Sequence, residues 1–115
     1  MMRPMPYDED LAHRVRAQLA DEPDVTEKAM FGGLAFLVGG HMAVAASGKG
    51  GLMVRVDPAQ TDALLSDPGA EPMVMRGRAL DGWLLVSPEG MRTAPQVAPW
   101  VARGVAFVRT LPAKG

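Results

Sequence analysis

Two glycine pairs divide an uncharged, mostly apolar segment that runs from Ala29 to Gly48. A membrane-spanning helix needs about 20 mainly apolar residues in a row, and Gly32-Gly33 and Gly39-Gly40 interrupt this segment. Because glycines supply the positive φ that tight hairpin turns require, the segment is predicted to form paired strands. Gly39-Gly40 is predicted as a two-residue hairpin turn, and Gly32-Gly33 as a bulge or sharp bend inside one long first strand.

Short connections predict an antiparallel meander here. The second strand is predicted over Met42–Ala46, and the loop Ser47–Gly51 leads into a third strand over Leu52–Val56. Strands joined by such short loops pair antiparallel, because a parallel pair needs a crossover of a dozen or more residues.

Local signals predict a helix before the meander. Asp8 is the expected N-cap of a helix over about residues 8–20, and the acids that follow it favour the positive end of the helix dipole. Leu11, Val15 and Leu19 recur at helical spacing and are predicted to form its buried stripe.

The second half of the sequence predicts a short helix and another hairpin. Asp57-Pro58 marks the start of the helix. A strand over Met73–Leu80, with Gly77 as a break or bulge, is followed by the turn Asp81-Gly82 and a strand over Trp83–Val86. An Asp-Gly pair between apolar residues is a strong hairpin signal.

A final helix is predicted over Gln96–Leu111. Its start is open by about four residues, because Thr93 could begin a capping box while Pro99 would then remove a hydrogen bond inside the helix. Gly104 lies in mid-helix, where glycine costs about 1 kcal/mol relative to alanine. Close approach of this helix to the sheet is the expected compensation.

These elements predict a two-layer α+β fold in the order α-β-β-β-α-β-β-α, with a five-stranded, mainly antiparallel sheet. The chain has 115 residues, the length of one ordinary domain. Residues 1–115 are therefore predicted to form a single domain, with residues 1–6 as a flexible tail.

Composition restricts the chemistry. The chain has no cysteine, which excludes disulfides, thiol catalysis and cysteine-ligated zinc. With 12 Lys and Arg residues against 13 Asp and Glu residues, the net charge is -1, so no overall basic field attracts nucleic acid or anionic membranes. No segment has the pattern of an export signal, and a cytoplasmic location is the expectation.

No catalytic, cofactor or metal site is predicted. Gly48-Lys49 lacks the spacing of a phosphate-binding loop, and a mobile hairpin loop is favoured there. Glu9 and His13 supply only two ligands for a metal, so a solvated helix face is favoured for them. We expect a non-enzymatic protein, with an enzyme of unrecognised site as the weaker alternative.

Five segments in order along the chain resemble the TfoX N-terminal domain family: Thr26–Phe36, Gly51–Val56, Asp67–Ala70, Gly82-Trp83 and Trp100–Gly104. The resemblance covers about Tyr7 to Pro112. It implies the helix and strand order given above and a relation to secretion-chaperone-like folds. The family includes the Sxy and TfoX regulators of natural competence, which usually carry a second, C-terminal helical domain. The chain thus resembles a stand-alone N-terminal domain, for which the family provides no established catalytic residues.

Nucleic-acid binding is the principal alternative function, as a nucleic-acid-associated transcription or competence regulator. The candidate basic patch consists of Lys28, Arg55, Arg76 and Arg78. Single-stranded nucleic acids are bound by exposed aromatic side chains among basic ones, and most aromatic residues here belong to predicted core faces. Direct nucleic-acid binding is therefore the less favoured interpretation.

The first strand is apolar on both faces, which favours an interaction surface. In a sheet with one solvent-exposed face, alternate residues should be polar, and three helices are not expected to cover both faces of five strands. The methionines near the strands favour core filling, with a deformable partner-binding surface as the alternative. The candidate interface residues are Phe31, Ala35, Leu37, Ala43 and Ala45. We expect a small regulatory module that acts through protein contacts as a two-fold homodimer.

Overall fold

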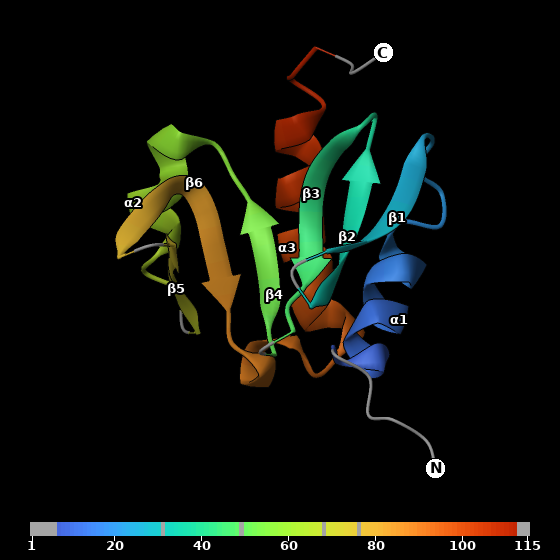
Figure 1. The fold of residues 1–115 in the computed structure, drawn as a ribbon, viewed down its shortest axis with the longest axis horizontal. Coiled ribbons are helices and arrows are strands. Elements are labelled where there is room, and N and C mark those ends of the chain that lie inside the picture. The colour runs from blue at the N-terminus through green and yellow to red at the C-terminus, as the bar shows by residue number, and fades with distance from the viewer. Residues whose placement is uncertain (1–6, 31, 49, 68, 76, 113–115) are drawn as a thin grey trace.

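Six antiparallel strands form one sheet in the order β1-β2-β3-β4-β6-β5, and the helices pack on one of its faces (Figure 1). The computed structural model describes residues 7–30, 32–48, 50–67, 69–75 and 77–112. The predicted tail at residues 1–6 and the Lys49 position of the glycine-rich loop lie outside these ranges.

The strands are β1 (Val25–Met30), β2 (Gly33–Val38), β3 (His41–Ala46), β4 (Leu52–Arg55), β5 (Ala70–Met75) and β6 (Arg78–Val86). The helices are α1 (Glu9–Gln18), the short α2 (Thr61–Leu64) and α3 (Ala94–Val108). Two 3-10 turns, Pro58–Gln60 and Pro88–Met91, precede α2 and α3. The α+β class and the antiparallel pairing agree with the prediction.

The prediction of five strands is wrong, because the expected long first strand is a hairpin of two strands. Met30 at the end of β1 pairs with Gly33 at the start of β2, and Gly32 between them has a φ of 75°. The glycine pair therefore belongs to a chain reversal and not to a bulge. The element order becomes α-β-β-β-β-α-β-β-α.

The second hairpin also turns at a different place from the predicted one. Met75 pairs with Arg78, so the chain reverses between these two residues, and Gly77 has a φ of 78°. Gly82 lies inside β6, where the pairing with β5 is irregular. Its amide donates to Thr61 Oγ1 at 3.1 Å, and its carbonyl accepts from the Val56 amide at 2.8 Å. The Asp-Gly pair thus lies in an irregular part of a strand that is held by the residue after β4 and by α2.

Other local predictions are confirmed. The Asp8 carboxylate caps α1 by accepting from the amides of Asp10 and Leu11 at 2.9 and 3.2 Å. Gly39 and Gly40 have φ values of 59° and 86° in the turn between β2 and β3. The early start of α3 is the correct one, because Thr93 forms a capping box and Pro99 lies inside the helix.

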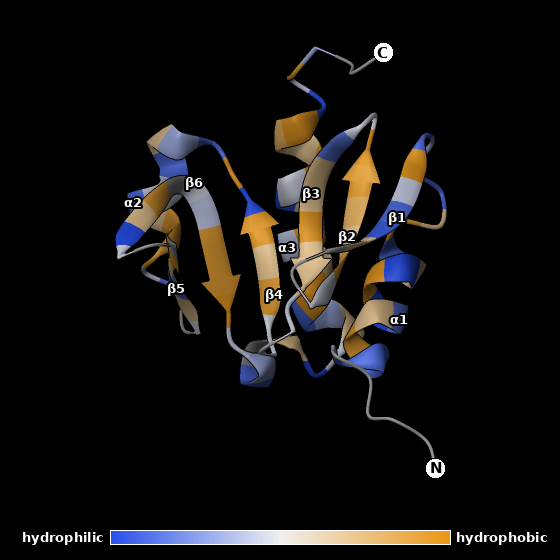
Figure 2. Ribbon diagram, viewed as in Figure 1, coloured by the Kyte–Doolittle hydropathy of each residue, from blue (hydrophilic) through white to orange (hydrophobic). Residues whose placement is uncertain are grey.

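The core lies between the sheet and the helices. It includes Phe36 and Val44 of the sheet, Leu11 of α1 and Trp100 of α3. α3 packs across β3 and β4, and α1 packs beside α3 (Figure 1). α2 contributes Leu64 at the margin of this core. Figure 2 shows that β2, β3 and β4 are mainly hydrophobic, whereas β1 is mixed.

A bidentate ion pair joins α1 to β1. The Nε and Nη2 atoms of Arg16 donate to the two carboxylate oxygens of Glu27 at 2.7 and 2.8 Å. The hydrogen bond from Arg16 holds the pKa of Glu27 below its ordinary value. Both side chains are partly exposed, so their contribution to stability is small.

Glu27→Gln is expected to lower the free energy of unfolding at neutral pH by less than about 1 kcal/mol. A carboxyl group with a depressed folded pKa stabilises the fold above its unfolded pKa, and this contribution is lost as the pH falls through the folded value. The difference between wild type and variant should therefore shrink below about pH 4. Urea unfolding of both proteins at neutral and at acidic pH measures this difference. An equal difference in the free energy of unfolding at the two pH values would contradict the lowered pKa of Glu27.

Candidate interaction surface

The face of the sheet opposite the helices, here called the open face, is defined by strand register. Residues paired across neighbouring strands point to the same side of a sheet. Leu34, Phe36 and Val38 of β2 point into the core, so Ala35 and Leu37 point to the other face. Following the pairs, the described open-face residues include Thr26, Lys28, Ala35, Leu37, Met42, Ala45, Met53, Leu85 and Glu71.

One line of paired residues, the cross-sheet row, crosses all six strands of the open face. The successive pairs are Lys28–Ala35, Ala35–Ala45, Ala45–Met53, Met53–Leu85 and Leu85–Glu71. A second, shorter line joins Thr26, Leu37 and Met42. The row is charged at its two ends and apolar at its four central positions.

The apolar residues of the open face partly shield one another. Ala35 and Ala45 are only 0% and 4% exposed, although no described helix covers them (Figure 1). Leu37, Met42 and Met53 are half-buried. Small side chains at the centre and longer ones around them make a shallow hollow, which Met42, Ala45 and Met53 help to line.

The prediction that Ala43 shares a face with Ala45 is wrong. β2 pairs Phe36 with Val44 and Leu37 with Met42, so Ala43 is the extra residue of a β-bulge. Such a residue shifts the alternation of side chains by one position. Ala43 and Val44 consequently both belong to the core. Of the other predicted interface residues, Ala35, Leu37 and Ala45 lie on the open face, and Phe31 lies outside the described residues.

The structure does not bring the predicted basic patch together. Lys28 is exposed on β1, and Arg55 lies three strands away on β4, roughly 14 Å at the usual strand spacing. Arg78 is exposed at the start of β6. Arg76 lies outside the described residues.

Two arginines instead lie against aromatic rings. The Arg55 guanidinium is 5.8 Å from the ring centroid of Trp83 and 5.6 Å from that of Phe107 on α3. By register, Arg55 and Trp83 lie on the same side of the sheet as Met53 and Leu85, although the Arg55 guanidinium also lies near Phe107 of α3. Arg103 lies 4.5 Å from the Trp100 ring. In a cation–π contact the guanidinium lies over the face of the ring. Arg55 and Arg103 are therefore explained as packing partners of these aromatic rings.

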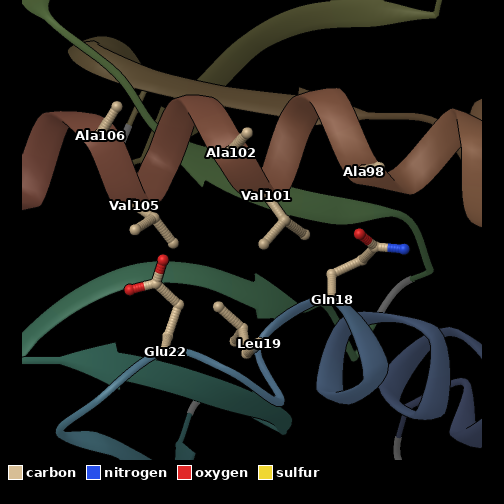
Figure 3. A pocket seen from close by; sticks show the side chains of 8 residues that line it. All are labelled: Gln18, Leu19, Glu22, Ala98, Val101, Ala102, Val105 and Ala106. Atoms are coloured by element: carbon tan, nitrogen blue, oxygen red, sulfur yellow. The ribbon is translucent and has the colours of Figure 1, made fainter.

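An open groove separates the end of α1 from α3 (Figure 3). Its volume is about 340 Å³, and it is lined by Gln18, Leu19, Glu22, Ala98, Val101, Ala102, Val105 and Ala106. Val101 and Val105 point toward Leu19 and Glu22, as Figure 3 shows. The Glu22 carboxylate accepts from Arg109 Nη2 at 2.8 Å, so the main charge at this groove is already paired.

Among the described residues, no three His, Asp or Glu side chains lie close enough together to hold a metal ion. No described helix is both long enough and apolar enough to cross a membrane.

Sequence reasoning did not assign Thr26, Leu85 or Glu71 to the open face. It considered Met42 and Met53 only within the less favoured interpretation of the methionines as a partner-binding surface. Met53 could have been identified from the charged residue two positions later, because Met53 and Arg55 share one face of the predicted strand. Glu71 could not have been found in this way, because its place in the row depends on β6 lying between β4 and β5.

Comparison with known proteins gives one match. The family model described as the TfoX N-terminal domain matches residues 17–108. No curated protein and no solved structure matches the chain.

Proposed function

The chain belongs to the TfoX N-terminal domain family, and we propose that it is a non-enzymatic, regulatory protein-interaction module that forms a homodimer through the open face. The observation that carries the proposal is the cross-sheet row, whose central residues are apolar on a face that none of the described helices covers. An antiparallel sheet with one solvated face ordinarily places polar residues there. A second copy would cover the apolar residues, and two-fold association is the commonest closed symmetry.

The size of the open face indicates a small interface, typical of a reversible complex. Six strands at a spacing of about 4.8 Å span roughly 24 Å, and paired strands of about five residues add roughly 17 Å in the other direction. The product, roughly 400 Å² per copy, is about half of what a standard stable interface contributes. We therefore expect a reversible dimer with a dissociation constant in the micromolar range, and sedimentation must extend to about 100 μM.

Leu37→Asp tests this interface directly. A carboxylate among the apolar residues of the contact would lose water without gaining a partner, so the dissociation constant should rise at least about ten-fold. Sedimentation equilibrium of wild type and variant measures the change. Met53→Gln provides a milder second substitution in the same face, should Leu37→Asp reduce the folded fraction.

Ala102→Asp is the matched control. Ala102 is exposed on α3, which packs on the other face of the sheet, so a new carboxylate there should leave the dissociation constant unchanged. Melting followed by circular dichroism establishes that each variant is folded. A folded Leu37→Asp variant that dimerises like the wild type would contradict the proposed interface.

The nucleic-acid-associated alternative makes a different prediction. Binding through phosphate contacts weakens steeply with salt, so it would produce a salt-dependent mobility shift with DNA. The separation of Lys28, Arg55 and Arg78 favours the protein-contact proposal over this alternative.

A further inference from the structure

The two ends of the cross-sheet row carry opposite charges. Lys28 is at one edge of the sheet, on β1, and Glu71 is at the other edge, on β5. Both side chains are exposed. Within the ranges that the structure describes, neither forms an ion pair. The row therefore presents a positive end, an apolar centre and a negative end on one face.

Symmetry determines what each end meets in a face-to-face dimer. The two-fold axis must lie between the two sheets, because an isologous interface uses the same patch on both copies. With the axis parallel to the strands, β1 of one copy lies over β5 of the other, and Lys28 faces Glu71 at both edges. With the axis across the strands, Lys28 of one copy faces Lys28 of the other, and Glu71 of one copy faces Glu71 of the other.

We infer that the homodimer has its two-fold axis parallel to the strands, with Lys28 of each copy beside Glu71 of the other. The inference rests on the proposed homodimer and specifies how the second copy is placed. Opposite charges at the rim of an interface add little affinity individually, whereas like charges placed together are unfavourable. The apolar central residues therefore provide the contact between the copies, and the charges at the ends determine how the two copies are oriented.

Neutralising the charge at either end of the row changes the dissociation constant in opposite directions for the two orientations of the axis. Lys28→Gln and Glu71→Gln should each weaken dimerisation about three-fold at low salt, because each change removes two attractive pairs per dimer. If the axis ran across the strands, the same changes would relieve repulsion and strengthen dimerisation. Sedimentation equilibrium of both variants and wild type distinguishes the two cases.

Charge reversal sharpens the test. Lys28→Glu and Glu71→Lys should each weaken dimerisation about ten-fold, and the double variant should return to within about two-fold of wild type. The differences should shrink in about 0.5 M salt, since salt screens exposed charges. Arg92→Glu and Asp21→Lys make the same changes of net charge at exposed positions away from the open face, and they should leave the dissociation constant unchanged.

The possible outcomes separate this inference from the proposed homodimer. Weakening by the single changes together with recovery in the double variant supports the parallel axis. Stronger dimers in Lys28→Gln or Glu71→Gln, or dimers that do not respond to either reversal, would overturn the parallel axis and leave the homodimer standing. A wild type that is monomeric at about 100 μM would remove the homodimer itself.

Discussion

Trp100→Ala is expected to lower the free energy of unfolding by about 3–5 kcal/mol, the range for truncating a large buried aromatic side chain. Trp100 is 6% exposed and belongs to the core between α3 and the sheet. Its removal would leave a cavity that the surrounding side chains can fill only in part, and Arg103 would lose the ring on which its guanidinium lies. Urea unfolding followed by circular dichroism measures the change.

Phe107→Ala is the comparison for Trp100→Ala on the same helix. Phe107 is half-buried at the margin of the core, so its truncation should cost less than that of Trp100. A loss below about 1 kcal/mol for Trp100→Ala would show that α3 does not dock through this face.

Gly104→Val is expected to destabilise the fold by about 3 kcal/mol, although glycine is the poorer helix former. A Cβ atom at Gly104 would lie 2.6 Å from the Ala43 carbonyl oxygen and 3.1 Å from Val44 Cγ1. Both neighbours belong to β3 at its bulge, where a backbone oxygen cannot move aside as a flexible side chain can. α3 would have to shift away from the sheet.

Ala102→Val is the control for Gly104→Val, because Ala102 lies two residues earlier on α3 and is exposed. There the cost should be only about 0.5 kcal/mol, the difference in helix propensity between alanine and valine. Propensity alone predicts that Gly104→Val stabilises the protein. An increase in the free energy of unfolding for this variant would therefore contradict the close packing of α3 on β3.

Features controlled by neighbouring residues could be predicted from the sequence. The Asp8 cap and the Gly39-Gly40 turn depend on contacts within a few positions, and both were predicted correctly. Gly104 was also interpreted correctly, because a glycine inside an otherwise apolar helix face is unfavourable unless something approaches it closely.

Features that depend on long-range pairing could not be predicted. Gly32-Gly33 suits both a bulge and a chain reversal, and only the pairing of β1 with β2 decides between them. Asp81-Gly82 carries a stronger local turn signal than residues 76–77, yet β6 continues through it because Val56 and Thr61 bind Gly82. The bulge at Ala43 left no sequence signal, and it moved this residue from the predicted interface to the core.

The same limit applies to the candidate surface. An apolar face of the sheet was predicted from residues of two neighbouring strands, and three of its predicted members lie there: Ala35, Leu37 and Ala45. The opposite charges at Lys28 and Glu71 became visible only with the strand order, because these residues lie on strands at the two edges of the sheet.

Methionine oxidation provides the most direct test of the claim that a second copy covers the open face. Met42 and Met53 are half-buried on this face, and accessible methionines are converted by peroxide to sulfoxides that mass spectrometry can assign to single residues. With peroxide in large excess, both residues should oxidise several-fold more slowly at about 100 μM protein than at about 1 μM. In Leu37→Asp the rates should not depend on protein concentration. Equal rates for the wild type at both concentrations would show that the open face stays uncovered, and would contradict the account.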